Sequence, residues 1–401
     1  MPFRYARDFL KDKWFVDVAE LNGIPSNRKI SDDDYEAIFN AEFQAEIESS
    51  KIDFSVDVED RFFRCHSQAP RDFYVLKFMK YSRIPDIVVW PKCHADVEFI
   101  VKAANKHNVV IIPVGGLTNV TCANNCPENE NRTIVSLDTT QMNRMLWLNE
   151  PSMLACFETG ITGQDLERTL NERGYLMGHE PDSVEFSTLG GWIATRSSGI
   201  KQQTYGNIED IVLSTKTVTS IGVLEKSFVA PRVAMGPELE HCIIGSEGTL
   251  GVVTEAIVRI HKLPKVRRFG AIIFPSFDVG IACLHECSRS DFLPASLRLL
   301  DNIHVKYGSA FRFNNSIFGE IFDRIGQIAL TNRFIFGYEE NSYALATYLF
   351  EGDKETVDTK EDKFVEVAKR HEGFKTGEKY GKRGYFMTLT VGYTRVSFKI
   401  K

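Results

Sequence analysis

The sequence lacks several features that would place it at once in a simple functional class. None of its apolar runs approaches the roughly 20 residues that a helix needs to cross a bilayer. Its first residues, MPFRYARDFLKDKWF, have no apolar stretch followed by small residues and so do not resemble a secretory signal. Its last four residues, Phe398 to Lys401, do not form a peroxisomal tripeptide of the SKL type. We therefore expect neither a transmembrane helix nor an ordinary targeting signal in these residues.

The chain also has no excess of positive charge and no metal-binding motif. Its net charge is −6 and its pI is near 5.9, which excludes the broad basic field typical of nucleic-acid binders. Eight cysteines are present, but there is no CxxC pair and no accompanying histidine cluster; Cys122/Cys126 and Cys283/Cys287 share only a CxxxC spacing. Free buried thiols in a reducing compartment are the preferred interpretation, and we expect no metal site.

The remaining composition is that of a globular protein. Of its 401 residues, 43% are hydrophobic and 25% are charged, which is enough for a sizeable core and typical of two or three structural units. The 29 phenylalanines exceed an average share. They are explained either by core filling or by an apolar substrate channel.

Hydrophobic patterns divide the chain into three parts. Residues 1–83 form an expected helical N-terminal extension, in which Tyr35, Ile38, Phe39 and Phe43 lie near 3.6-residue spacing within a helix predicted over Asp32 to Ile47. Residues 84–262 form a second part and residues 263–401 a third. The fold class that we predict is α+β.

The second part begins with a β-α-β pattern. The apolar run Ile87–Trp90 predicts a strand that Pro91 ends. A helix is predicted over Asp96–Asn105, and a second strand over Val109–Ile112 runs directly into a glycine turn. Further predicted strands are Thr133–Leu137, Leu154–Glu158 and Val252–Ile260, and Thr162 is expected to cap a helix that ends near Gly174.

The third part repeats a mixed pattern. Strands are predicted over Ala271–Phe274, Ala295–Leu300, Ala344–Glu351 and Tyr385–Tyr393, with helices near Val279–Cys287 and Glu355–Arg370. This predicts a separate α+β cap domain.

Three glycine-bearing segments lie in the second part. They are PVGGLTN (113–119), the segment from Gly178 to Gly199, and GSEGTLGVV (245–253). Glycine lets the backbone approach a charged ligand and expose N–H groups as an anion-binding nest. The first segment is neither GxGxxG nor GxxxxGK[ST], so it indicates neither an ordinary Rossmann site nor a P-loop. A plain tight turn is the competing interpretation for each segment alone.

Taken together and in this order, the segments resemble the FAD-binding domain of the vanillyl-alcohol-oxidase superfamily (PCMH type). Five segments are similar to sequences of the alkyldihydroxyacetonephosphate synthase family: HEPDSVEFSTLGGWIATRSSG, YGNIED, GSEGTLGVVTEA, PASLRLLDN and LATYLFEGD. This likeness runs from about Arg61 to Arg395. The resemblance implies a two-subdomain FAD-binding domain at 84–262 and an incomplete cap domain at 263–401.

The resemblance also implies one FAD held without a covalent link, in agreement with the absence of histidine from PVGGLTN. By matching position, the cofactor-binding residues would be Pro113, Val114, Gly115, Gly116, Leu117, Thr118, Asn119, Asp182, Ser183, Val184, Glu185, Phe186, Ser187, Thr188, Thr195, Arg196, Ser197, Ser198, Glu247, Gly248, Thr249, Leu250, Gly251, Val252 and Val253.

One departure from the family pattern lies in the first loop. The family usually reads PxGGGTS, whereas this chain has Leu117 in place of the third glycine and Asn119 in place of the serine. If the backbone at this position has φ > 0, a leucine is strained there by about 1–2 kcal/mol. The FAD affinity would be reduced accordingly.

Three charged or titratable residues are candidates for chemistry. In a strand, Ser296 and Arg298 share one face while Leu297 points to the other, and Arg298 matches an activity-critical arginine of the family; a structural ion pair is the alternative. Arg395 matches a substrate-contacting arginine, whose guanidinium fork suits a phosphate. His179 lies beside the second loop and is either an acid–base group or a structural histidine.

The family reaction exchanges the acyl chain of acyl-dihydroxyacetonephosphate for a long-chain fatty alcohol, through a flavin adduct and without net redox change. The resemblance further implies a homodimer, peripheral membrane contact and a peroxisomal location, with no nucleic-acid partner. The family's C-terminal tyrosine and its HHH run are absent from these 401 residues, so we expect this chain by itself to be inactive. A hydroxy-acid oxidase or dehydrogenase, and a non-catalytic FAD-binding protein that pairs with an intact synthase, are the alternative functions.

Overall fold

The computed structural model describes residues 34–226, 228, 230, 234–305 and 342–386. The chain divides into two compact units, and each is described by itself. The larger unit spans Asn27–Leu263; the smaller unit comprises Pro264–Lys401 together with Met1–Ser26. Arg395 and most of the strand predicted over Tyr385–Tyr393 lie outside the described residues.

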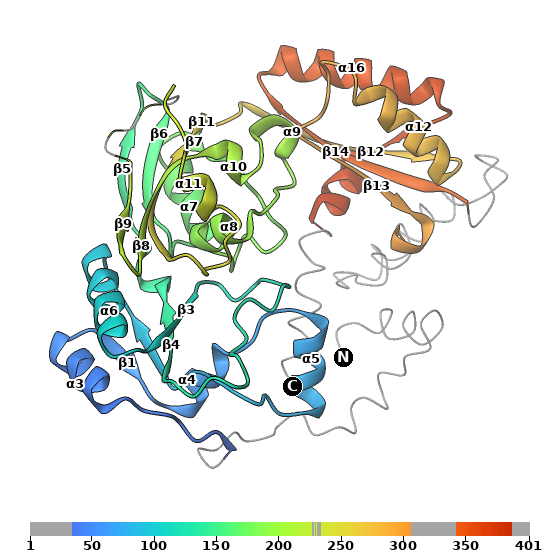
Figure 1. Cartoon of the computed structure of the whole chain (residues 1–401). Helices are drawn as coiled ribbons and strands as arrows, with labels where there is room; N and C mark the ends of the chain where they lie inside the picture. The colour runs from blue at the N-terminus through green and yellow to red at the C-terminus, as the bar shows by residue number, and fades with distance from the viewer. Residues whose placement is uncertain (1–33, 227, 229, 231–233, 306–341, 387–401) are drawn as a thin grey trace. The chain divides into compact units, whose positions relative to one another are not determined.

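A mixed four-stranded sheet forms one half of the larger unit (Figure 1). Its order is β1-β2-β4-β3, with β1 antiparallel to β2 and the other two pairs parallel. The strands are β1 (Asp53–Ser55), β2 (Ile87–Trp90), β3 (Val110–Val114) and β4 (Ile134–Asp138), and the helices of this half are α3 (Ala41–Ser50), α4 (Val58–Phe63), α5 (Pro70–Phe78) and α6 (His94–Lys106). The predicted strand–helix–strand order of β2, α6 and β3 is confirmed.

Helix α6 connects this sheet to the second half of the unit. Its apolar face, which includes Val97 and Ile100, is fully buried, as the 3.6-residue periodicity predicts. The same buried cluster contains Val89 and Val135 of the first sheet and Val252 of the second. The two halves of the larger unit therefore share one continuous core around α6.

The second half is built on an antiparallel five-stranded sheet of order β5-β6-β10-β8-β9. The strands are β5 (Met145–Asn149), β6 (Leu154–Glu158), β8 (Val212–Thr219), β9 (Gly222–Leu224) and β10 (Val252–Arg259). Helices α7 (Gly163–Asn171) and α8 (Leu189–Thr195) bring Leu166 and Trp192 into one core with Phe157 and Ala256. The remaining short elements are a 3₁₀ turn (Thr139–Gln141), β7 (Tyr175–Leu176), α9 (Gln202–Tyr205), α10 (Ile208–Ile211), α11 (Glu240–Ile243) and β11 (His261–Lys262).

Two local expectations of the larger unit have different outcomes. The predicted cap of α7 is confirmed, because the Thr162 hydroxyl accepts from the N–H of Asp165 at 3.3 Å. The helix predicted over Asp32–Ile47 is wrong in its first part, since residues 36–40 are irregular. Asn40 caps α3 and starts it at Ala41, so only the later part of the predicted helix forms. The capping amide thus outweighs the apolar spacing before it.

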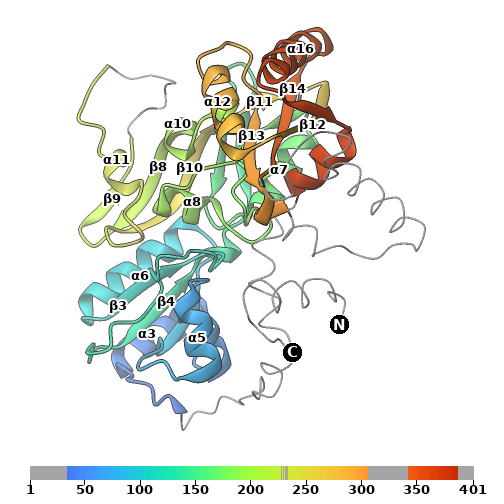
Figure 2. The same ribbon diagram turned by 90° about the vertical axis from the view of Figure 1, so that its right-hand side faces the viewer.

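The smaller unit has an antiparallel sheet of order β13-β14-β12-β15. Its strands are β12 (Val266–Phe274), β13 (Ser296–Asp301), β14 (Ala344–Gly352) and β15 (Phe374–Thr376), and helices α12 (Phe277–Cys287) and α16 (Lys354–Arg370) cover one face (Figure 2). Tyr348, Phe350 and Phe364 form mutual edge-to-face pairs in this core. The two units together have the mixed helix and sheet content that the sequence predicts.

The strand predicted from Tyr385 onward is wrong where the structure describes it, because residues 378–386 are helical. Lys382 pairs with Glu378 one turn earlier, and the Tyr385 ring packs edge-on against Phe269 of β12. Packing of the aromatic residues on a strand of the sheet satisfies them without a further strand.

Two further observations concern membrane spans and cysteines. Across the described ranges, no helix combines the length and apolar character that a membrane span requires. All eight cysteines lie within those ranges, and none of them forms a disulfide there.

The aromatic core predicts how the smaller unit responds to mutation. Phe364→Ala removes a fully buried ring, and we expect it to lower the free energy of unfolding of this unit by about 3–5 kcal/mol. The adjacent exposed Lys363→Ala serves as the matched control and should change it by less than about 0.5 kcal/mol. Urea denaturation followed by circular dichroism measures both; equal effects would contradict this packing.

Candidate functional site

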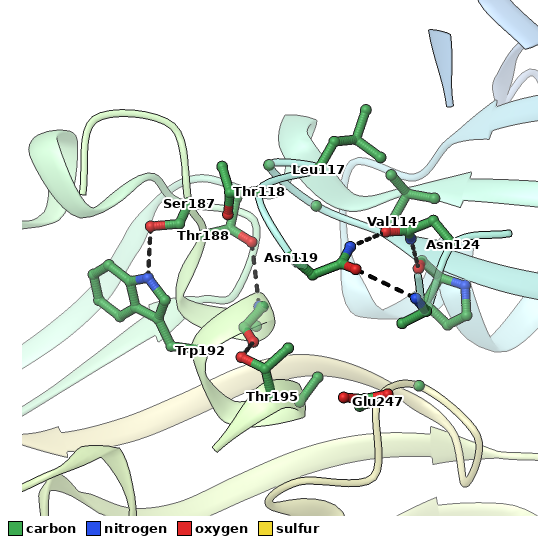
Figure 3. A pocket seen from close by; sticks show the side chains of 18 of the residues that line it. Val114, Leu117, Thr118, Asn119, Asn124, Ser187, Thr188, Trp192, Thr195 and Glu247 are labelled. Carbon is green, nitrogen blue, oxygen red and sulfur yellow. Dashed lines mark hydrogen bonds between the residues drawn. The ribbon is translucent and has the colours of Figure 1, made fainter. Parts of the chain in front are cut away.

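The three glycine-bearing segments meet at one cavity of about 360 Å³ within the larger unit (Figure 3). The first segment follows β3, the second leads into α8, and the third precedes β10. The predicted residues that line the cavity are Pro113, Val114, Gly115, Gly116, Leu117, Thr118, Asn119, Ser183, Ser187, Thr188, Thr195, Ser197, Glu247, Gly248, Gly251, Val252 and Val253. Three segments that are far apart in the sequence thus line one cavity.

Other predicted residues of the same segments do not line this cavity: Asp182, Val184, Glu185, Phe186, Arg196, Ser198, Thr249 and Leu250. Phe186 is half exposed, and its carbonyl supports the first loop. Arg196 ends α8 in a left-handed conformation and pairs with Glu209. These residues shape the loops without facing the cavity.

The loops touch one another closely because their glycines have no side chains. A Cβ at Gly116 would lie 1.9 Å from the carbonyl oxygen of Phe186, and one at Gly115 would lie 2.3 Å from the Thr188 hydroxyl. Gly248 of the third loop, with φ +79, packs on the ring of Pro113. Glycine is therefore required here for the loops to approach.

The first loop exposes backbone donors. Within the described part of the chain, the N–H groups of Gly116, Leu117 and Thr118 donate to no protein acceptor. Successive free N–H groups in a glycine turn form a concave site that suits an anionic oxygen. This arrangement fits the pyrophosphate of a dinucleotide.

Hydroxyl groups surround the start of α8. Thr188 caps this helix by accepting from the N–H of Gly191 at 3.3 Å. The Ser187 hydroxyl accepts from the Trp192 indole N–H at 2.7 Å and donates to the carbonyl of Ser183. The Thr195 hydroxyl donates to the Gly191 carbonyl at 2.8 Å. The polar side of the cavity is therefore preorganised by its own hydrogen bonds.

Leu117 has the left-handed backbone that would make a leucine costly. The φ angle of Leu117 is +55°, and 8% of the surface of this residue is exposed. Left-handed backbone costs a side-chain-bearing residue about 1–2 kcal/mol. The strain considered from the sequence is therefore present, although burial of the side chain offsets part of it.

His179 lies behind the cavity wall and is fully buried. Its Nε2 is 2.9 Å from the hydroxyl of Ser197, which does line the cavity, and its Nδ1 has no partner among the described residues. Burial lowers the pKa of His179 to about 4, so the ring is neutral near pH 7. An Nε2–H tautomer leaves only an acceptor unsatisfied and frees the Ser197 O–H to donate into the cavity.

The carboxylate of Glu167, a partly buried residue, holds the backbone that leads to His179. Glu167 accepts from the N–H groups of Gly178 at 2.9 Å and Met177 at 3.2 Å. Burial raises the pKa of Glu167 to about 7, against the effect of these two donors and of nearby Lys201. No motif pointed to Glu167, because its neighbours become close only in the folded chain.

Several residues that line the cavity were not among the predicted cofactor-binding residues. Thr139 and Thr159 directly follow β4 and β6, and Asn124 comes from the segment after the first loop. The other additional lining residues are Val120, Thr121, Ala123, Pro181, Gly190, Gly191, Trp192, Ala194 and Ser246. Six of these, Pro181, Gly190, Gly191, Trp192, Ala194 and Ser246, lie inside the glycine-bearing segments, so the pattern could have identified them.

Arg298, the arginine predicted as catalytic, belongs to the smaller unit. Arg298 lies in β13, where its neighbours Leu297 and Leu299 pack into the core under α12 and α16. The alternation of a strand therefore turns Arg298 to the opposite face, as the sequence predicts. Its backbone is paired with Thr347 of β14.

Two family models match this chain, one in each of its two units. Residues 85–227 match the model of the FAD binding domain, and residues 263–384 match that of the C-terminal domain of FAD linked oxidases. An alkyldihydroxyacetonephosphate synthase of Caenorhabditis elegans is 37% identical over 95% of this chain and 64% of its own length. One from Dictyostelium discoideum is 36% identical over 78% of this chain and 50% of its own length. The chain thus spans between half and two thirds of these curated relatives.

A solved structure gives the same match in three dimensions. The structure titled alkyldihydroxyacetonephosphate synthase superposes with a TM-score of 0.85 and 30% identity, covering 98% of this chain and 71% of that one. The predicted PCMH-type fold is therefore confirmed, and FAD is the cofactor that the matched domains bind.

The contact between the first two loops gives a testable prediction. Gly116→Ala places a methyl group against the Phe186 carbonyl, so the loops must separate. We expect overpacking to cost about 1–3 kcal/mol of unfolding free energy and to weaken FAD binding at least tenfold. Gly377→Ala, where a Cβ meets nothing within 4 Å, is the control. Flavin fluorescence titration and urea denaturation measure both effects, and an unaltered FAD affinity in Gly116→Ala would refute the arrangement.

The buried imidazole gives a pH prediction. The folded-state pKa of His179 is about 4, below its ordinary value of 6.5, so the unfolded chain binds the proton more readily between these values. Its contribution to stability is complete above pH 6.5 and is lost as the pH falls toward 4. Between pH 7 and pH 5, the wild type should lose on the order of 2 kcal/mol more than His179→Gln does.

His179→Gln keeps a donor near the Nε2 position but cannot be protonated. Urea denaturation of the two proteins at both pH values isolates the contribution of His179, because the other groups are common to both. Parallel pH profiles would show that the imidazole does not titrate in this way.

Proposed function

The chain belongs to the alkyldihydroxyacetonephosphate synthase family, and from this premise we propose that it takes part in making the ether bond of ether lipids. The proposed reaction replaces the acyl chain of acyl-dihydroxyacetonephosphate with a long-chain fatty alcohol and releases a fatty acid. The observation that carries it is the family likeness over 95% of the chain, through both units.

The cavity at the three loops is the proposed FAD site. The free N–H groups of Gly116, Leu117 and Thr118 would hold the pyrophosphate, and the hydroxyls around α8 would orient the ring system. No histidine lies in the first loop, which supports binding without a covalent link. FAD, when bound, supplies the ring chemistry of the exchange.

The protein's own groups position the reactants in this proposal. Ser197, held by the neutral imidazole of His179, would donate a hydrogen bond into the cavity, so His179 acts through Ser197 and stays neutral near pH 7. Arg298 is the proposed catalytic arginine, and Arg395, which lies outside the described residues, would bind the phosphate through its guanidinium fork.

The first experiment tests cofactor and substrate class together. The purified chain should carry the flavin absorption bands, and palmitoyl-dihydroxyacetonephosphate should perturb them. Glycerol 3-phosphate serves as the control, because it has the phosphate but neither the ketone nor the acyl chain. A colourless protein after reconstitution with FAD would overturn the proposed cofactor site.

The match to the C-terminal domain of FAD linked oxidases favours a hydroxy-acid oxidase as the second candidate. D-Lactate or glycolate, added without oxygen, would bleach the flavin of such an enzyme. We expect no bleaching here. Bleaching by a hydroxy acid, with no response to the acyl ketone phosphate, would replace the proposed function.

Incorporation of labelled hexadecanol into alkyl-dihydroxyacetonephosphate tests the expectation that these 401 residues are inactive by themselves. The HHH run of the family is absent from them, and that expectation stays a prediction. Robust turnover would contradict it while supporting the proposed reaction.

A further inference from the structure

The strained backbone at Leu117 needs a restraint from elsewhere in the fold. With φ +55°, this leucine lies in a region that glycine adopts freely and that other side chains avoid. The residue sits in the middle of the three free N–H groups of the first loop. Any relaxation of Leu117 toward negative φ would therefore turn these donors away from one another.

The side chain of Asn119, two residues later, makes three hydrogen bonds. Its Oδ1 accepts from the N–H of Ala123 at 3.3 Å and from the Thr121 hydroxyl at 3.4 Å. Its Nδ2 donates to Oδ1 of Asn124 (Figure 3). Its backbone carbonyl accepts from the N–H of Gln68 at 2.8 Å. The C-terminal side of the loop is therefore fixed on two separate segments.

Asn124 connects Asn119 to the residues that precede Leu117. It is 7% exposed, and its Nδ2 donates to the carbonyl of Pro113 at 3.4 Å. Pro113, Asn124 and Asn119 thus form a closed chain of contacts that bridges the loop on both sides of Leu117. We call this the amide bridge.

A carboxamide is needed for this bridge. Asn119 accepts two hydrogen bonds and donates a third through opposite ends of one planar group. A serine hydroxyl has a single oxygen close to the backbone, so it cannot reach Ala123 and Asn124 together. The two unusual residues of this loop, Leu117 and Asn119, are thereby physically connected.

We propose that Asn119 is a positioning residue that holds Leu117 in its left-handed conformation and so keeps the first loop shaped for the FAD pyrophosphate. This inference rests on the FAD site of the proposed function and is independent of the chemistry at the flavin. In this proposal the contacts of Asn119 compensate for the backbone strain at Leu117. With glycine at position 117 there is no such strain, so Asn119 should no longer be needed.

The test combines Asn119→Ser with three residues at position 117: leucine, alanine and glycine. Leu117→Ala removes the buried side chain but keeps the cost of a left-handed backbone, whereas Leu117→Gly removes both. The alanine series therefore separates lost packing from backbone strain. FAD dissociation constants are measured by flavin fluorescence, and urea midpoints are measured on the FAD-free proteins.

We expect Asn119→Ser to weaken FAD binding about tenfold with leucine or alanine at position 117, which corresponds to about 1.4 kcal/mol. With glycine the same change should cost less than about threefold, so Leu117→Gly rescues the serine variant. A purely local folding role for Asn119 would give equal losses in all three series and would overturn the proposal. So would a loss that follows side-chain size, with alanine behaving like glycine.

Two precautions keep the outcome decisive. If Asn119→Ser does not fold with leucine present, Asn124→Ala opens the amide bridge from its other end and is tested in the same three series. If the wild type fails to bind FAD, the proposed cofactor site fails. The urea midpoints then decide this inference alone: a larger drop with leucine and alanine than with glycine supports it, and equal drops refute it.

Discussion

The absence of a side chain at Gly116 is the constraint on which the site depends. The Phe186 carbonyl occupies the space that a Cβ would take, so the first two loops can approach this closely here only because residue 116 is glycine. Gly115 against Thr188 and Gly248 against Pro113 extend the same contact to all three loops. The cavity is therefore formed by backbone proximity, and its N–H groups are available because no side chain covers them.

The larger unit supplies the rigid frame that such contacts require. The apolar face of helix α6 shares a buried core with both sheets, and Trp192 of α8 lies in the core of the second sheet while its indole N–H donates to Ser187 at the cavity. Loops fixed on buried helices and strands keep their geometry better than free loops do. This rigidity also explains how a strained residue such as Leu117 persists, since the surrounding contacts determine its backbone.

Much of the fold could be predicted because its signals are local. The buried face of α6, the cap at Thr162 and the run Ile87–Trp90 each carry their periodicity or capping residue within a few positions. Helix α8 gave no such signal, because Gly190 and Gly191 weaken helix propensity and only the Thr188 cap and tertiary packing overcome this. Tyr385 and Phe386 have β propensity but lie in a helix, and the Tyr385 ring packs against Phe269 of β12.

The site was less predictable than the fold for the same physical reason. Glycine patterns identified the loops, but which residues face the cavity depends on contacts between segments that are distant in sequence. Phe186 and Arg196 support the loops without lining the cavity, whereas Thr139 and Thr159 line it from strand ends without any motif. His179 was recognised, yet its place behind Ser197 follows only from the folded geometry.

Two titratable groups behind the cavity have pKa values shifted in opposite directions. Burial lowers the pKa of His179 and raises that of Glu167, so both groups favour their neutral forms in the folded chain. Between about pH 4.5 and 6.5, stability rises with pH through His179 and falls with pH through Glu167, so the two slopes oppose each other. Between about pH 4 and pH 7, both groups are therefore mainly neutral in the folded chain. Lys201 forms an ion pair with Glu180 in this region, so these two opposite charges offset each other.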